Sequence, residues 1–356
     1  MVGHREGQGE EFLLFPEDAL RTFAVDALLA LGAPEEEAAL VADGLITASL
    51  WWHPAQGQGL EKLFRYQRQI RIGGIVPGVP MRWVREGPAF ALLDAGKGFG
   101  YVAGRRAMQK AVEKAREVGV AAVGVRHSNH FGIAGYHALA AAEQGLIGWA
   151  MTNAKAEMAP WGSAKPVLGT NPWGIAVPCQ HAPPIVLDMA LTASGKGMMR
   201  WYAQLGRPIP VHWALTPEGR RTTDPAEAME GPLLPIGEYK GYGLSLITDI
   251  LTGVMTGALF GLSVFQDDAN HNVGHWMLAV DPGAFMPREQ FAERLEALLQ
   301  EVKSAPPVDP ERPVLLPGEW EQDRMAQRRR EGIPVLPQTA RALKELAGDL
   351  GISSPF

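Results

Sequence analysis

The sequence predicts a soluble α/β protein with more than one lobe. Short apolar runs such as AFALLDA, GVAAVGV and LIGWAMT alternate with segments of helical periodicity along the middle of the chain, which is the pattern of strands packed against helices. Amphipathic segments lie near both ends. The 356 residues also exceed the length that one hydrophobic core usually serves. We therefore expect an α/β centre with a separate helical part.

Two helices are expected near the N-terminus. Apolar residues recur at helical spacing from Leu20 onward, Gly32 ends the first helix, and Pro34 opens the second. Near the C-terminus, Thr339 is a candidate N-cap for a helix that ends at Gly351. If the apolar faces of these terminal segments pack together, they form one helical lobe.

Two later segments also carry structural signals. Residues 242–265 are apolar enough to imitate a membrane span, but Asp249 lies within them and no basic flank accompanies them. We expect a buried helix there. Residues 305–337 are rich in proline and charge and are expected to form an extended connection.

Composition excludes several classes of protein. The net charge of −6 and the isoelectric point near 5.9 argue against nucleic acid or an anionic membrane as a partner. The single cysteine, Cys179, excludes an internal disulfide and any multi-cysteine metal site, and it points to a reducing, cytoplasmic compartment. The polar N-terminal residues do not form a signal peptide.

A glycine motif follows one of the apolar runs. Gly98, Gly100 and Ala103 match the spacing of a dinucleotide-binding fingerprint between a strand and a helix. The acidic residue that would bind the ribose at the end of the next strand is absent, and Arg126 stands there. The motif by itself therefore favours a tight strand-to-helix turn over a dinucleotide site.

Three histidines, His127, His130 and His137, lie within eleven residues. Helical zinc sites usually place histidines four residues apart, whereas Gly132 and Gly135 interrupt any helix between these three. This disfavours a metal site. A histidine in a Ser-Asn-His-Phe-Gly turn suits general acid–base chemistry. The local sequence leaves that role and a purely structural role open.

Several motifs in order resolve the question by resemblance. The chain resembles the malate/L-lactate dehydrogenase family across about residues 12–345. The motifs that carry the resemblance are SNHFGIAGYH, GTNPWGIAVP, VLDMALTASGKG, YKGYGLSLITDILTG and HNVGH. These are the type 2 enzymes, unrelated to the Rossmann-fold malate and lactate dehydrogenases. The family contains nicotinamide-dependent reductases of 2-oxoacids, ureidoglycolate, diketogulonate and cyclic imino acids.

The resemblance implies a fold and an assembly. It implies a non-Rossmann cofactor lobe with a mixed, largely antiparallel sheet, and a helical lobe built from both termini, so that the glycines at 96–100 become structural. The expected lobes are residues 1–75 with about 310–356, residues 76–125 with about 230–309 as a mixed α/β lobe, and residues 126–229 for cofactor binding and catalysis. A homodimer is also implied, with the active site near its interface.

The resemblance also implies functional residues. His130 matches the catalytic general acid/base, which would exchange a proton with the substrate oxygen while NAD or NADP exchanges the hydride, without a metal. His127 and His137 become bystanders. The residues implied in substrate binding are Gln58, Lys62, Thr170 and Asn171, and those implied in cofactor binding are Asp188, Met189, Ala190, Lys240, Gly241, Asn272 and Gly274.

The chain departs from the family pattern at two places. Relatives carry Ser-His-Gly followed by an arginine. Counting back from Tyr66 aligns the family histidine with Gln58, which is flanked by glycines, and the family arginine with Lys62. Counting forward from Ala48 aligns the histidine with Gln56 instead. Neither frame supplies the histidine, although His53 stands nearby, and lysine lacks the bidentate fork of arginine. The second departure is Ala154-Lys155, where relatives often place a small hydroxyl residue and proline.

The expected function is therefore an NAD(P)-dependent oxidoreductase that interconverts a small 2-hydroxy acid and a 2-oxoacid of the malate or lactate type. Three alternatives remain open. The first is a reductase of cyclic imine carboxylates, and the second is a dinucleotide-binding relative with weakened catalysis. The third is a metal-dependent hydrolase or lyase built on the three histidines.

Overall fold

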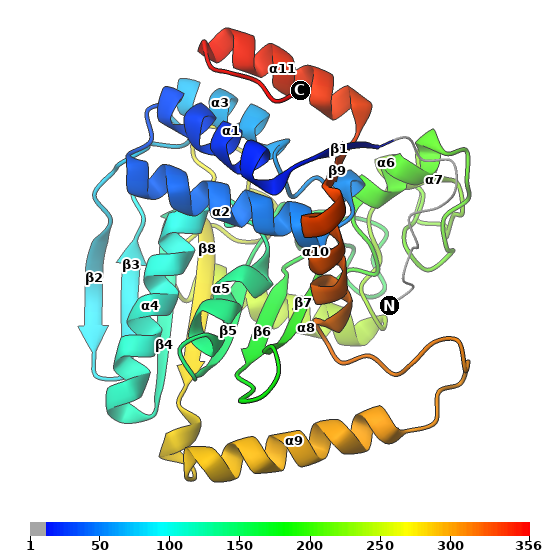
Figure 1. Cartoon of the computed structure of the whole chain (residues 1–356). Helices are drawn as coiled ribbons and strands as arrows, with labels where there is room; N and C mark the ends of the chain where they lie inside the picture. The colour runs from blue at the N-terminus through cyan, green and yellow to red at the C-terminus, as the bar shows by residue number, and fades with distance from the viewer. Residues whose placement is uncertain (1–11) are drawn as a thin grey trace.

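A seven-stranded sheet runs through the centre of the computed structural model, which describes residues 12–356 (Figure 1). Only the pair β3–β4 is parallel, and the other neighbouring pairs are antiparallel. This confirms the expected mixed, largely antiparallel sheet. In spatial order the strands are β2 (Arg82–Gly87), β3 (Phe90–Asp94), β4 (Val120–Ser128), β8 (Val273–Val280), β5 (Ile147–Thr152), β6 (Trp173–Val177) and β7 (Ile185–Met189).

Two helices cover one face of this sheet. The helix α4 (Gly100–Val118) connects β3 to β4, and α5 (Ala134–Ala142) packs on β5 and β6 (Figure 1). The buried stripe of α4 is rich in alanine, and small side chains allow helix and sheet to approach closely. Because β8 comes from the second half of the chain and lies between β4 and β5, it joins the two halves into one core.

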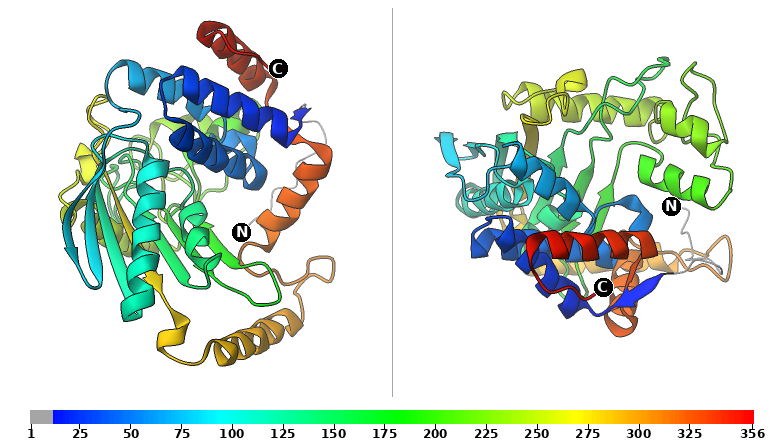
Figure 2. Two further views of the ribbon diagram at one scale, coloured as in Figure 1. Left: turned by 60° about the vertical axis from the view of Figure 1, so that its left-hand side comes forward. Right: turned by 90° about the horizontal axis from the view of Figure 1, so that it is seen from above.

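Both ends of the chain contribute to one helical lobe, as predicted. In Figure 2 the blue N-terminal helices and the red C-terminal helix lie side by side. The strands β1 (Leu13–Phe15) and β9 (Ile333–Val335) pair across the lobe, and the Phe356 ring lies 4.8 Å from the Phe15 ring. The helices of the lobe are α1 (Glu17–Ala30), α2 (Glu35–Trp51), α3 (Lys62–Arg71), α10 (Glu319–Glu331) and α11 (Pro337–Leu350).

The helix boundaries correct two predictions. Gly351 ends α11 in the left-handed conformation as expected, but α11 begins at Pro337, so Thr339 lies inside its first turn rather than at the N-cap. Residues 305–337 were expected to be extended, yet they contain α10 and β9. The helix α10 has little apolar periodicity. It is instead held by buried Arg328, whose guanidinium donates to carbonyl oxygens of Ser49, Leu50 and Trp52 at the end of α2.

The apolar segment 242–265 also differs from prediction. The helix α8 (Tyr239–Asp249) continues into a π-helical turn, Ile250–Val254, and lies on the sheet face opposite α4 and α5. The segment is not fully buried, since Ile247 is 51% exposed and Val254 is 54% exposed. None of the described helices combines the length and the apolar character that crossing a membrane requires.

The remaining helices lie at the margins of the sheet. The short helices α6 (Lys196–Gln204) and α7 (Pro225–Glu230) share a small apolar core that includes Met199 and Trp213. The helix α9 (Arg288–Ser304) runs along the opposite end of the molecule and buries none of its residues fully (Figure 1).

Candidate active site

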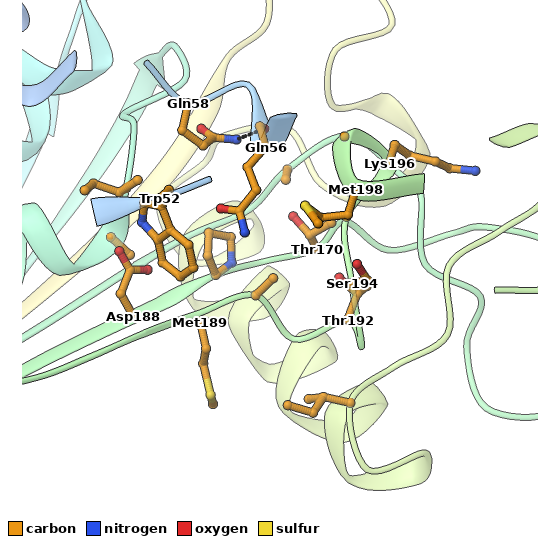
Figure 3. A pocket seen from close by; sticks show the side chains of 18 of the residues that line it. Trp52, Gln56, Gln58, Thr170, Asp188, Met189, Thr192, Ser194, Lys196 and Met198 are labelled. Carbon is orange, nitrogen blue, oxygen red and sulfur yellow. Dashed lines mark hydrogen bonds between the residues drawn. The ribbon is translucent and has the colours of Figure 1, made fainter. Parts of the chain in front are cut away.

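A cavity of about 2100 Å³ lies between the helical lobe, the end of β7 and the α6–α7 region. Pockets for one drug-sized ligand usually measure roughly 300–1,000 Å³. This cavity therefore has room for a dinucleotide and a small substrate together. Figure 3 shows part of its wall, where Trp52, Gln56 and Gln58 from the helical lobe approach Asp188 and Thr170.

The cavity gathers seven of the residues singled out from the sequence. These are Gln58, Lys62, His130, Thr170, Asp188, Met189 and Ala190. His53 and Gln56 border the cavity too. Both residues that could align with the family histidine, Gln56 and Gln58, therefore lie at the site. Asn171, Lys240, Gly241, Asn272 and Gly274 are not part of its described lining.

Four of the five residues outside the lining have packing or hydrogen-bonding roles in the fold. The Asn171 side chain accepts a hydrogen bond from the Ala154 amide and donates to Ser245. Asn272 accepts from the His127 amide at 2.7 Å. A Cβ at Gly241 or Gly274 would overlap neighbouring backbone, so close packing explains both glycines, and Lys240 lies exposed at the start of α8.

The loop that carries His130 is fixed by its neighbour Asn129. The buried Asn129 amide nitrogen lies 3.0–3.1 Å from the carbonyl oxygens of Gly74, Lys97 and Gly98, and its oxygen lies 2.9 Å from His271 Nδ1. Four segments of the chain thus meet at one side chain. Such a fully engaged polar group restricts the loop to one conformation.

A stack of three rings supports the loop from the core. The Phe131 ring lies between the rings of His137 and His275, with centroids 4.6 Å and 4.7 Å away. His137 Nε2 lies 2.8 Å from the Phe131 carbonyl oxygen, and His275 lies between Ser128 and Thr152. Burial lowers the pKa of each histidine to about 3. Both are neutral at physiological pH and support the loop.

His130 itself borders the cavity and has a defined hydrogen bond. The Gly132 amide donates to His130 Nδ1 at 3.1 Å. Burial lowers the pKa of His130 well below its usual value, and the nearby charges of Lys62 and Arg65 lower it further, as do His275 and His271. His130 is therefore a neutral imidazole near pH 7.

A cationic wall faces the cavity from α3. Lys62 is the first residue of α3 and Arg65 lies one turn later on the same face, a spacing of three that the sequence already shows. The Arg65 guanidinium lies 4.7 Å from the centre of the Phe265 ring. Burial, followed by the charge of Arg65, lowers the pKa of Lys62 to about 8. Sequence reasoning did not single out Arg65.

One acidic residue of the cavity was also missed. Burial raises the pKa of the Glu157 carboxyl, although the charges of Lys196, Lys155, Arg200 and Lys62 act in the opposite direction. No sequence signal distinguishes Glu157, because only the fold brings it near Lys62, Lys196 and Arg200; Lys155 alone is a neighbour in the sequence.

Asp188 lies on another part of the wall, at the end of β7 and the beginning of α5. The Ala134 and Gly135 amides donate to its carboxyl group, but burial and nearby Glu321 raise its pKa to about 7. Within the described residues, Asp188 Oδ2 and Thr192 Oγ1 are buried without a hydrogen-bond partner. Because both residues line the cavity, a bound ligand can supply the missing hydrogen bonds. A nicotinamide dinucleotide, with its amide and ribose hydroxyls, fits this wall.

No metal centre is built by the described residues. The three histidines that suggested one are separated in function, since His127 contacts Asp94 at 2.9 Å and His137 belongs to the ring stack. Across residues 12–356, His, Cys, Asp and Glu side chains do not gather in a group of three that could hold a metal ion.

Comparison with known proteins places this site in a family. The sequence profile described as malate/L-lactate dehydrogenase matches residues 15–344. The chain belongs to the malate/L-lactate dehydrogenase family. It is accordingly an oxidoreductase of the hydroxy-acid dehydrogenase class.

Relatives support the assignment over almost the whole chain. The malate dehydrogenase of Pyrococcus abyssi is 39% identical over 352 residues, which cover 96% of each protein. The L-sulfolactate dehydrogenase of Methanocaldococcus jannaschii is 35% identical and is matched over 96% of this chain and 98% of its own. The crystal structure of malate dehydrogenase from Entamoeba histolytica has a TM-score of 0.92 at 29% identity and covers 97% of this chain and 100% of its own.

Proposed function

We propose that this family member interconverts a small 2-hydroxy acid and the corresponding 2-oxoacid with NAD or NADP. The observation that carries the proposal is that two kinds of side chain line one cavity. Lys62 and Arg65 bring positive charge to it, and Asp188 and Thr192 each bring a buried polar atom that lacks a partner among the described residues. His130 borders the same cavity.

The cationic wall supports an anionic substrate. Lysine and arginine bind carboxylates by charge-assisted hydrogen bonds, and arginine adds a bidentate geometry. Two cations one helical turn apart make the site electropositive, which favours a substrate with two anionic groups over one with a single carboxylate. We therefore favour a malate-type substrate over lactate, in keeping with relatives named malate dehydrogenase and L-sulfolactate dehydrogenase.

The remaining residues have complementary roles in this proposal. Bound NAD(P) supplies or accepts the hydride. Asp188 and Thr192 would hold the amide and hydroxyl groups of the cofactor. His130 lies at the reacting oxygen of the substrate, and Gln58 and Thr170 complete the hydrogen bonding around the acid.

The proposal is tested by following absorbance at 340 nm with NADH and NADPH. The substrate panel contains oxaloacetate, sulfopyruvate, pyruvate and a cyclic imine carboxylate. We expect turnover with the dianionic 2-oxoacids and a rate about 10²-fold lower in the His130→Ala variant, with cofactor binding retained. Turnover of the imine alone would contradict the proposal. Cofactor binding without any turnover would indicate a relative with weakened catalysis.

We also propose that the chain functions as a cytoplasmic homodimer. Large apolar side chains are exposed along α8 and the residues that follow, including Ile247, Val254, Met255, Phe260 and Leu262, each 51–56% exposed. Contiguous apolar surface of this kind favours association with a second copy. The lone Cys179, which forms no disulfide, is compatible with a reducing compartment.

A further inference from the structure

Reduction of a 2-oxoacid requires a proton for the oxygen as well as a hydride for the carbon. The sequence assigned that proton to His130, but the hydrogen bonding of this residue bears on the assignment. The Gly132 N–H can only donate, so His130 Nδ1 must accept and carries no hydrogen. The neutral ring therefore carries its single hydrogen on Nε2. In that state it can donate a hydrogen bond, and a full proton transfer from it would leave an imidazolate.

The surroundings of His130 oppose the imidazolium form. Protonation of Nδ1 would place two N–H groups against each other at the Gly132 contact. The first turn of α4 packs so closely on this loop that a Cβ at Gly100 would overlap the carbonyl groups of Asn129 and His130. The helix α5 begins at Ala134, four residues after His130. Helix N-termini are electropositive, so both disfavour a cation there.

Lys62, in contrast to His130, is placed to exchange a proton. It lines the cavity at the first position of α3, and its ammonium group has no hydrogen bond or ion pair with any of residues 12–356. Lys196, which also borders the cavity, instead donates to the carbonyl oxygens of Ala228, Met229 and Gly231. Gln58 and Gln56, the two residues that the alternative counts align with the family histidine, have no ionisable group. Lys62 thus has an unengaged ammonium group facing the same space as His130.

We propose that Lys62 Nζ exchanges the proton with the reacting oxygen, while His130 stabilises that oxygen through a hydrogen bond from its neutral Nε2–H. This inference rests on the proposed function. In reduction, the carbonyl carbon receives the hydride, the C=O π pair moves to oxygen, and oxygen takes a proton from the Lys62 ammonium. The amine is left neutral. In oxidation, the neutral amine removes the hydroxyl proton as the carbon loses its hydride.

The electrostatics of Lys62 agree with this role. Its pKa of about 8 results from burial and from Arg65, with Glu61 and Glu157 acting in the opposite direction. Arg65 belongs to α3, Glu61 to the turn before α3, and Glu157 to the segment 154–158. A lysine of ordinary pKa would be a poor base near neutral pH, whereas a pKa near the working pH suits both directions. Arginine, which one count of the family motif aligns with Lys62, cannot exchange a proton.

Kinetics of Lys62→Arg separate proton exchange from carboxylate binding. The variant keeps the positive charge, so we expect KM for the 2-oxoacid to change by less than about fivefold while kcat falls about 10²-fold or more. In the wild type, kcat/KM for oxidation should rise with pH through about 8, because this profile reports the pKa of the free enzyme, and Lys62→Arg should lose this limb. A Lys62→Arg variant with wild-type kcat and an unchanged pH profile would overturn the proposal. Lys110→Arg, on the surface of α4 beside Glu86, is the matched control.

Two measurements on the free enzyme do not depend on turnover. Competitive labelling with acetic anhydride, read by mass spectrometry, should show Lys62 half-deprotonated near pH 8, whereas Lys110 should behave as an ordinary lysine. The ¹⁵N shifts of His130 should report the Nε2–H tautomer from pH 6 to pH 8. A His130 imidazolium in that range, or an ordinary pKa for Lys62, would refute the inference. If the wild type instead lacks turnover with every hydroxy acid, the proposed function fails independently of these two results.

Replacement of His130 adds a third discriminating result. Glutamine retains an N–H donor but cannot exchange a proton, so His130→Gln should recover at least about tenfold of the activity lost in His130→Ala. If His130 were the proton donor, both variants would lose activity equally. Equal loss would therefore contradict the inference.

Discussion

The substitution Gly132→Ala tests how tightly the His130 loop is packed. Gly132 has φ +83°, and a Cβ built there would overlap the ring of Tyr101, which is fully buried. The left-handed conformation costs a non-glycine residue about 1–2 kcal/mol. Overpacking a dense core adds about 1–3 kcal/mol. We therefore expect a loss of about 2–5 kcal/mol in the free energy of unfolding.

The control Gly206→Ala isolates the steric part of this cost. Gly206 has φ +61° and nothing within 4 Å of its hypothetical Cβ, so only the backbone cost of about 1–2 kcal/mol applies. The unfolding entropy, about 2.1 cal/mol/K per residue, gives about 0.75 kcal/mol/K for 356 residues. The expected fall in Tm is then about 3–7 °C for Gly132→Ala and about 1–3 °C for Gly206→Ala.

Differential scanning calorimetry measures both shifts, and kinetics measure the effect on the site. Because the Gly132 amide holds His130 Nδ1, displacing it should also reduce kcat about tenfold or more, while Gly206→Ala should leave kcat unchanged. Equal Tm shifts for the two variants would refute the argument that Tyr101 packing limits this position. Unchanged kcat in Gly132→Ala would refute its link to His130.

Three further predictions concern pH and assembly. Burial raises the pKa of Asp188 from its unfolded value to about 7, so its ionisation destabilises the native state. Asp188→Asn should therefore raise Tm by about 5–6 °C relative to wild type at pH 8 but not at pH 4. No difference at pH 8 would contradict the buried carboxyl. His137 and His275 have pKa values of about 3, so stability should fall as pH drops from 6.5 toward 3, with the two contributing about 2.7 kcal/mol per pH unit. Urea titrations should show about half of this contribution lost in His137→Phe, and an unchanged slope would argue against the assignment. Val254→Glu should convert the dimer to a monomer in light scattering at micromolar concentration, and a wild-type monomer would remove the proposed interface.

The sequence alone supports much of the fold because its signals are local. Apolar runs predicted β3, β4 and β5, and Gly351 ended α11 as expected. Errors occurred where burial comes from distant partners. The helix α10 has weak apolar periodicity and depends on Arg328, and α8 leaves apolar side chains exposed that a purely local pattern assigns to a core.

The candidate site divides in a similar way. Ordered motifs were sufficient for the family and for seven residues of the cavity wall. Asn171, Asn272 and Gly274 belong to the same motifs, but in the structure they serve packing and backbone hydrogen bonds. A sequence motif does not distinguish a residue that contacts the ligand from a residue that packs behind the site.

By itself the sequence determined the family, several of the central strands, and the presence of His130 and Lys62. Only the tertiary structure decided how these two residues can share the chemistry. The tautomer of His130 depends on the Gly132 amide, the loop depends on Asn129 meeting His271 from 142 residues away, and the pKa of Lys62 depends on burial. Protonation reflects the electrostatic field of all surrounding groups, and folding alone sets which groups surround a residue.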